Sequence, residues 1–202
     1  MGRIWKNALL LLLLAGLCAG CTAPHMAQTT ERMTQSTMPR RVLPGKTDAA
    51  RLLEMIWSQY EDTERFSVYG GLPEQPVLDA PGDLDMELVT QWAYRYRFPT
   101  AHLKSVGHGA SMTHLMNENL LTLTVFHVQQ PEKIQQLAED WRWELQHSNW
   151  ASSRPDRLLL SQVEGEYLLM AYGSHEYVKL LQKKTTAAFP ESRILYQEAI
   201  TV

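Results

Sequence analysis

The clearest hydrophobic pattern in this chain is an alternation with period two between Leu120 and Val128. Such alternation is typical of a strand, because successive side chains point to opposite faces of a sheet. Neither set of alternating positions is wholly polar, which favours a central strand, covered on one side and partly shielded on the other. Apolar runs at 157–163 and 167–172 predict two more strands joined by a short loop containing Gly165. The segment 194–202 predicts a last strand.

Apolar residues spaced three and four apart predict four helices. Thr47 and Asp83 are suited to cap the first two, because short polar side chains satisfy the free N–H groups of a helix start. Pro99 limits the second helix, Pro131 suits the first turn of the third, and Ser174 suits the cap of the last. The positions expected to face the core are Leu52, Leu53, Ile56 and Tyr60; Leu88, Val89, Trp92 and Tyr96; Ile134, Leu137, Ala138, Trp141 and Leu145; and Val178, Leu181 and Lys184.

The order of these elements predicts the fold class. The segment 66–81, with two glycines and three prolines, is expected to be a loop. The segment 107–111 is also expected to be a loop, with a short strand over 103–109 as the alternative. The C-terminal half then has the order β-α-β-β-α. Two strands joined by a helix are normally parallel, and the hairpin adds an antiparallel strand. We therefore predict an α+β domain: a small mixed sheet with a ferredoxin-like layer arrangement and N-terminal helices packed on it.

The first residues of the chain resemble a bacterial lipoprotein signal peptide. Arg3 and Lys6 precede a ten-residue apolar stretch, 8–17, and two small residues lead to Cys21. A membrane-spanning helix needs about 20 apolar residues, so a stretch of this length favours a signal-peptide core. The resemblance implies that residues 1–20 are removed and that Cys21 receives a lipid anchor of the palmitate type. An ordinary secreted protein and an uncleaved anchor are the alternatives, and Cys18 stands where such precursors usually carry a branched aliphatic residue.

The predicted mature chain divides into a tether and one domain. Residues 21–45 are rich in Thr, Gln, Ser and Pro and show no apolar periodicity, which is typical of a flexible segment. Residues 46–202 are long enough for a single domain with its own core. Since Cys21 would be the one cysteine left, no intramolecular disulfide and no thiolate zinc site is expected.

Charge argues against a nucleic-acid partner. The chain has 19 basic and 22 acidic residues and a net charge of −3. Removing Arg3 and Lys6 with the leader leaves 17 against 22, a net charge of −5. Nucleic-acid-binding domains usually carry a basic excess.

Histidines are the main candidates for chemistry. His102, His108 and His114 are six residues apart, which does not fit the i, i+4 spacing of helical zinc ligands. His127 lies in the predicted central strand, where it is either a packed histidine or a general base. The sequence contains no nucleophile elbow, phosphate-binding loop or dinucleotide fingerprint, so we assign no catalytic residue, metal ligand or cofactor.

Aromatic residues give a second kind of candidate. Tyr94 and Phe98 lie in the second predicted helix, while Trp143 and Trp150 fall off the buried stripe of the third. Tryptophan and tyrosine are enriched in binding surfaces. These four residues are therefore candidates for an exposed binding surface; the alternative is that they cover the edges of the core.

Three segments together resemble the DUF4358 family, which consists of small, mostly uncharacterised Firmicutes proteins, many with lipoprotein signals. The segments are the strand 122–128, the start of the helix at 131–138 and the hairpin 161–172, and the resemblance spans about 84–185. It implies an extracytoplasmic lipoprotein of a Gram-positive bacterium with unknown molecular function. It implies no functional residue.

These observations favour a non-enzymatic binding or accessory domain, anchored to the cell membrane through Cys21 on its extracytoplasmic face. Its expected partner is another envelope protein or a small ligand. One alternative is an envelope hydrolase or metal-dependent enzyme using His108 or His127. A second alternative is a purely structural envelope protein.

Overall fold

The computed structural model describes residues 47–150 and 153–201. The predicted leader, the lipidation site Cys21 and the predicted tether lie outside the described residues. Among the residues that the structure describes, no helix is long and apolar enough to cross a membrane.

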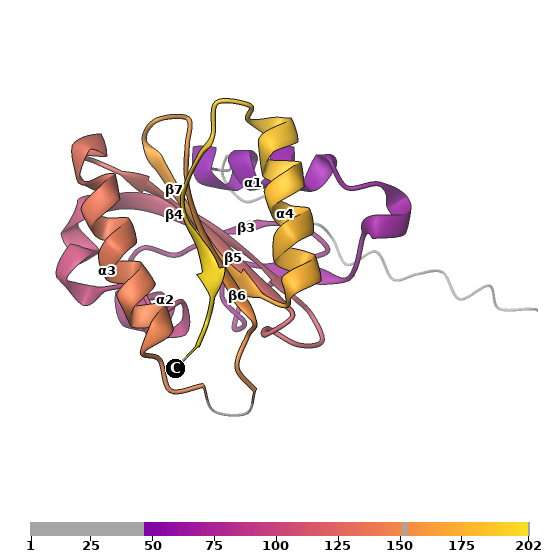
Figure 1. Cartoon of the computed structure of the whole chain (residues 1–202), viewed down its shortest axis with the longest axis horizontal. Coiled ribbons are helices and arrows are strands. Elements are labelled where there is room, and N and C mark those ends of the chain that lie inside the picture. The colour runs from indigo at the N-terminus through magenta and orange to yellow at the C-terminus, as the bar shows by residue number, and fades with distance from the viewer. Residues whose placement is uncertain (1–46, 151–152, 202) are drawn as a thin grey trace, which may run out of the picture. The chain divides into compact units, whose positions relative to one another are not determined.

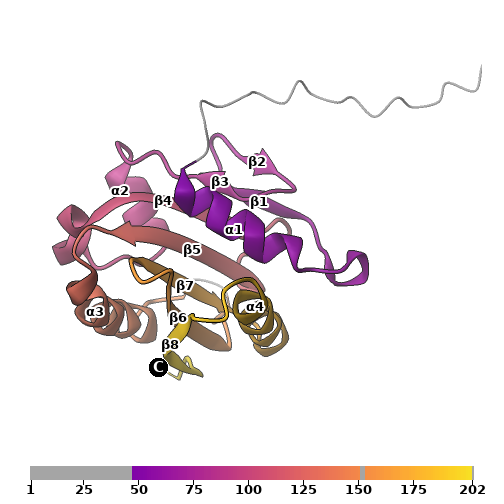
Figure 2. The same cartoon turned by 90° about the horizontal axis from the view of Figure 1, so that it is seen from above.

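A single antiparallel sheet forms the centre of the described chain. Its strands lie in the order β2–β1–β4–β5–β7–β6–β8, and β3 also pairs with β4 (Figures 1 and 2). The strands are β1 (Val68–Gly70), β2 (Val77–Leu78), β3 (Gly82–Asp83), β4 (Val106–His114), β5 (Leu121–Val128), β6 (Arg157–Val163), β7 (Tyr167–Gly173) and β8 (Arg193–Ala199).

Helices cover both faces of this sheet, which confirms the predicted α+β class. Helices α1 and α4 lie on one face, and α2 and α3 on the other (Figure 2). The helices are α1 (Asp48–Ser58), α2 (Val89–Arg95), α3 (Ile134–Gln146) and α4 (His175–Ala188), with short 3₁₀ helices η1 (Asp62–Glu64), η2 (Thr100–Ser105) and η3 (Pro131–Lys133).

The pairing of β5 and β6 differs from the prediction. These two strands do run in the same direction, but β7 lies between them, so every strand pair in the described residues is antiparallel. Leu169 of β7, for example, is opposite Val125 on one side and Ser161 on the other. Inserting the hairpin partner between the two strands therefore replaces the expected parallel contact with two antiparallel ones.

Two glycine-containing segments that were predicted as loops contain strands, and the second agrees with the alternative of a short strand near 103–109. Residues 66–81 contain β1 and β2, and a Cβ atom on Gly70 would lie only 1.9 Å from the nitrogen of Gly82 in β3. Residues 107–111 belong to β4, where a Cβ atom on Gly109 would lie 2.6 Å from the ring of Phe126 on β5. The glycines at these positions permit close packing rather than flexibility.

The start of α1 is as predicted, but the predicted cap of the second helix is not. Thr47 caps α1, because its hydroxyl accepts a hydrogen bond from the backbone N–H of Ala50 at 3.4 Å. Asp83 accepts the hydroxyl hydrogen bond of Thr47 from its place in β3. Helix α2 begins at Val89 instead, so Asp83 ties α1 to the sheet edge rather than capping α2.

A buried lysine joins α4 to the end of α1. Lys184 donates a hydrogen bond to the carbonyl oxygen of Gln59 at 2.8 Å and forms an ion pair with Glu64. Its ammonium nitrogen also lies 5.5 Å from the ring centroid of Tyr60. The last carbonyl groups of a helix have no partner within the helix, so this contact satisfies one of them.

We expect the Glu64–Lys184 pair to make stability depend on pH. The hydrogen bond from Lys184 holds the pKa of Glu64 below its usual 4.5. A group whose pKa is depressed by folding stabilises the protein above its unfolded pKa and loses that contribution as the pH falls through the folded value. Glu64→Gln should therefore lower the melting temperature most near neutral pH. The difference in melting temperature between the variant and the wild type should disappear below about pH 4.5.

Thermal unfolding followed by circular dichroism between pH 7 and 3 measures this. Glu74→Gln is the control, because Glu74 is exposed and makes no ion pair in the described chain. A difference in melting temperature between Glu64→Gln and the wild type that stayed constant down to pH 3 would contradict the prediction.

Candidate binding site at the end of helix α2

Helix α2 ends in a sharp reversal that places an arginine in an unusual backbone conformation. Phe98 N–H bonds to the carbonyl of Ala93 at 2.9 Å, and Arg97 N–H bonds to that of Tyr94 at 3.3 Å. These two bonds define a Schellman motif, which needs a left-handed residue and usually has glycine there. Arg97 occupies this position with φ 54°. A side chain in this conformation costs roughly 1–2 kcal/mol.

The side chain of Arg97 lies between two aromatic rings. Its guanidinium carbon is 5.3 Å from the ring centroid of Tyr94 and 5.3 Å from that of Trp150. One terminal nitrogen donates to the carbonyl of Tyr94 at 3.0 Å, while Nε is buried without a hydrogen-bond partner in the described chain. Trp150 in turn packs edge-on against Tyr172 at 5.0 Å. Arg97 thus brings together two of the aromatic residues predicted to form a surface.

Phe98 does not belong to that surface. Its side chain is only 3% exposed. It packs against Trp92, Phe126 and Trp141 with ring centroids 4.9–5.2 Å away. A Schellman motif commonly turns the residue after the left-handed position back onto the helix. The reversal at Arg97 therefore buries Phe98, and the sequence carried no glycine to signal it.

Trp143 forms a separate feature. It is 56% exposed and stacks on His147, one turn further along, with ring centroids 4.4 Å apart. No aromatic contact in the described chain links it to Tyr94 or Trp150. The predicted surface is therefore divided between two places.

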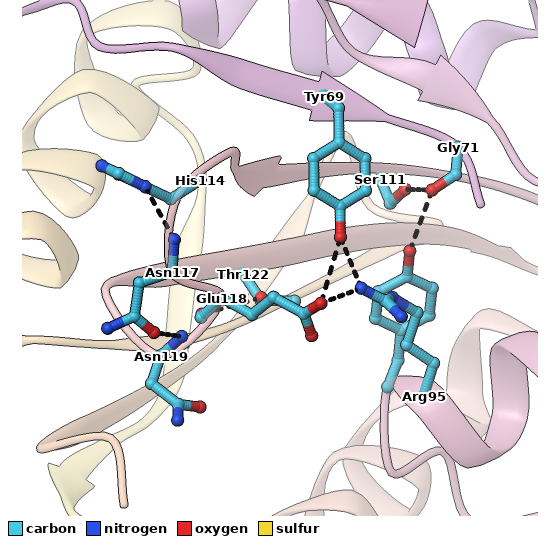
Figure 3. A network of polar contacts seen from close by, with 10 residues as sticks. Tyr69, Gly71, Arg95, Ser111, His114, Asn117, Glu118, Asn119 and Thr122 are labelled. Atoms are coloured by element: carbon cyan, nitrogen blue, oxygen red, sulfur yellow. Dashed lines mark hydrogen bonds and ion pairs between the residues drawn. The ribbon is translucent and has the colours of Figure 1, made fainter. Parts of the chain in front are cut away.

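A second arginine of α2, Arg95, lies in a polar network (Figure 3). Its guanidinium donates to the hydroxyl of Tyr69 and to the carboxylate of Glu118, and those two groups are 3.4 Å apart. Burial would lower the pKa of Arg95, but Tyr69 and Glu118 outweigh it and raise that pKa. Burial raises the pKa of Tyr69, so its phenol stays neutral. The network fixes a charged arginine between α2, β1 and the β4–β5 loop.

The carbonyl of Gly71 is a second hydrogen-bond acceptor in the same region (Figure 3). It accepts hydrogen bonds from the hydroxyls of Tyr96 at 3.2 Å and Ser111 at 3.0 Å. Burial raises the pKa of Tyr96, which keeps it a hydrogen-bond donor. Trp92 Nε1 and Thr124 Oγ1 are also buried on this side of the sheet, and neither has a hydrogen-bond partner among the described residues. The layer under α2 is therefore rich in polar groups.

Exposed apolar side chains occur on the elements that hold the two arginines and their partners. Tyr94 is 78% exposed and Met116, in the same β4–β5 loop as Glu118, is 82% exposed. Leu78 is also exposed and lies opposite Tyr69 in the β1–β2 pair. Clustered apolar residues on a surface mark interaction sites. We call the group of Leu78, Tyr94, Arg97, Met116 and Trp150 the α2 surface.

His102 and His114, two of the histidines considered as metal ligands, lie in separate environments. His102 Nε2 lies 2.6 Å from a carboxylate oxygen of Asp140, and His114 stacks on Phe66 at 5.1 Å. Within residues 47–150 and 153–201, no group of three or more His, Cys, Asp or Glu residues could hold a metal ion.

His108 and His127 do meet, on neighbouring strands β4 and β5. Their rings stack in parallel with centroids 4.9 Å apart, and His127 Nε2 lies 3.6 Å from Glu166. Burial, and then the neighbouring His127, lowers the pKa of His108. Neither ring forms a hydrogen bond with a serine or threonine hydroxyl in the described chain, so the pair lacks the nucleophile contact of a hydrolase.

Comparison with known proteins gives no relative: no family model, curated protein or solved structure matches the chain. The resemblance to DUF4358 stays a prediction from the sequence. The geometry of the α2 surface is accordingly the main guide to function.

We expect glycine to be better tolerated than alanine at position 97. Both changes remove the stack, but only glycine relieves the left-handed strain, so Arg97→Gly should be more stable than Arg97→Ala by about 0.5–1 kcal/mol. At Gln91, exposed in the middle of α2, the order should reverse, with alanine about 1 kcal/mol more stable than glycine. Urea unfolding of the four variants measures both differences. Equal stability of the two Arg97 variants would show that this backbone is not strained.

Proposed function

We propose that this chain is a non-enzymatic binding or accessory domain, lipid-anchored through Cys21 on the extracytoplasmic face of the bacterial cell membrane. It binds another envelope protein or a small ligand through the α2 surface. No cofactor enters this proposal, and the acidic net charge argues against nucleic acid as the ligand.

The observation that supports binding is the position of Arg97. An arginine occupies a backbone position that glycine fills at lower cost, and its guanidinium is held between Tyr94 and Trp150. Strained backbone is concentrated at functional sites, and arginine and aromatic residues are enriched in interfaces.

The other two hypotheses fit less well. A hydrolase using His108 or His127 needs a hydroxyl or water nucleophile held against the imidazole, whereas these two rings face each other. A purely structural protein has no need for Tyr94 and Met116 to be as exposed as they are.

The location in this proposal rests on Arg3, Lys6, the apolar stretch 8–17 and Cys21. We expect the wild-type protein to incorporate a fatty-acid analogue and to sediment with membranes. Cys21→Ser should abolish labelling, because only the thiol of Cys21 can form the thioether to the lipid. Cys18→Ser is the matched control and should leave labelling intact. Labelling that persists in Cys21→Ser would refute the anchor.

The α2 surface is tested by site-specific photo-crosslinking in intact cells. A photoreactive amino acid replaces Tyr94, and the same amino acid at Met55 is the control, since Met55 is an exposed apolar residue on α1, across the sheet. We expect a discrete crosslinked species from position 94 alone. Arg97→Gly should reduce it at least about fivefold, because truncating a hot-spot residue, a class enriched in arginine, costs about 2 kcal/mol or more.

Two outcomes would overturn the binding proposal. One is equal crosslinking from positions 94 and 55, which would indicate unspecific encounters. The other is an unchanged species in Arg97→Gly at unchanged protein level, which would show that the stack has no part in binding.

A further inference from the structure

Strand β8 ends the sheet with an open edge. It pairs with β6 on one side and with no other strand of the described chain on the other (Figure 2). An edge strand presents a row of backbone N–H and C=O groups that can pair with another extended segment. The opposite edge is formed by β2, which is only two residues long. Seven residues make β8 the longer of the two open edges.

A surface hollow lies beside β8 on each face of the sheet. The hollow next to α4 measures about 250 Å³, and the hollow next to α3 measures about 400 Å³. The first is lined by Arg157, His175, Val178, Lys179, Gln182 and Gln197. The second is lined by Arg142, Gln146, His147, Glu198, Ala199 and Thr201.

Consecutive side chains of β8 point to opposite hollows. Gln197 donates to Gln182 of α4 at 2.6 Å, whereas Glu198 accepts from Arg142 of α3 at 2.6 and 3.0 Å. A strand added beside β8 would follow the same alternation, because side chains in a sheet alternate between its faces. Its side chains would therefore fall in turn toward α4 and toward α3. Strand addition obtains affinity from backbone hydrogen bonds and specificity from such alternating sites.

The two hollows differ in charge. In the α3-side hollow, Glu198 already neutralises Arg142. In the α4-side hollow, Arg157, Lys179 and His175 form no side-chain ion pair in the described residues. The carboxylate of Asp156 accepts a hydrogen bond from the backbone N–H of His175 at 3.2 Å. No acidic residue lines this hollow. The α4-side hollow is thus complementary to a carboxylate.

The regular part of the edge coincides with the hollows. The register between β6 and β8 shifts between Leu160 and Ser161, which places a bulge at Leu195. From Tyr196 to Ala199 the pairing with β6 is regular, and this section contributes Gln197, Glu198 and Ala199 to the hollows. Bulges hinder pairing along an edge, so the bulge limits the open section to these last residues. Within it, the carbonyl oxygen of Ala199 already accepts a hydrogen bond from the side chain of Gln146 at 2.7 Å, which leaves one lone pair of that oxygen for a partner.

We infer that β8 is a docking edge for an extended, acidic segment of a partner protein. The segment adds to the sheet beside Tyr196–Ala199, and its Asp or Glu side chains enter the α4-side hollow. Apolar side chains of the same segment face α3, where His147 of the second hollow stacks on the exposed ring of Trp143. This docking edge is separate from the α2 surface and does not depend on it.

The test uses the full-length lipidated protein in detergent and a fluorescent peptide, TVEVEVEVT, which places glutamates on one face of a strand. Binding is followed by fluorescence anisotropy at low salt. We expect Lys179→Glu to weaken binding about three- to tenfold, through loss of attraction and added repulsion. Lys183→Glu, an equal charge change at an exposed residue that does not line the hollow, should alter it less than about twofold.

Two matched peptides separate charge from strand pairing. The glutamine analogue TVQVQVQVT should bind more weakly than the glutamate peptide, and an N-methylated glutamate peptide should not bind, because it cannot complete the edge hydrogen bonds. Hydrogen exchange followed by mass spectrometry should show protection of residues 196–199 by the glutamate peptide.

Several results would overturn the inference. They are no binding of the glutamate peptide at millimolar concentration, equal binding of the glutamine peptide, equal effects of the two lysine variants, or no protection of β8. A concentration-dependent dimer with β8 protected in the absence of peptide would assign the edge to a second copy of this chain instead. None of these results depends on crosslinking at Tyr94, so the two proposals can fail separately.

Discussion

The structure depends on one constraint: the central strands are buried on both faces. In β5, Val125 packs with α1 and α4, while the next residue, Phe126, packs with α2 and α3. Strand β7 repeats this with Leu169 and Met170. A sheet buried on both sides needs a helical layer on each, since apolar surface left in water costs about 25 cal/mol per Å². The two layers leave the outer strands uncovered along the sheet edges, and the proposed docking edge β8 is one of them. The α2 surface lies instead mainly at the end of a covering helix.

The end of α2 shows how packing and binding are coupled in this fold. The reversal at Arg97 turns Phe98 back into the core against Trp92 and leaves the guanidinium at the surface between Tyr94 and Trp150. The burial of Phe98 offsets the backbone strain of Arg97, because a buried phenylalanine contributes about 1.5–3 kcal/mol. The same motif therefore anchors the helix and fixes the orientation of the arginine. Arg95, held by Tyr69 and Glu118, stiffens the neighbouring turn.

Much of the local structure could be predicted, and the errors have identifiable causes. The strand at 121–128, the cap at Thr47 and the buried stripe of α3 follow from patterns within a few residues. The glycines of β1 and β4 were interpreted as loop residues. They are needed because a residue distant in the sequence packs against each of them: Gly82 in one case and the ring of Phe126 in the other. The site was half predicted. Tyr94 and Trp150 were candidates, but Arg97, which joins them, had no signal in the sequence.

The sequence by itself determined the order and type of most secondary-structure elements. It is also the basis for the predicted leader at residues 1–20 and the predicted lipidation at Cys21. Both depend on periodicity and local chemistry, which are readable along the chain. The tertiary structure alone decided that β7 lies between β5 and β6, that Phe98 is buried and that His108 meets His127. The physical reason is that periodicity specifies which face of an element is buried but not what covers it. Strand neighbours and ring contacts are chosen by packing between residues far apart in the chain.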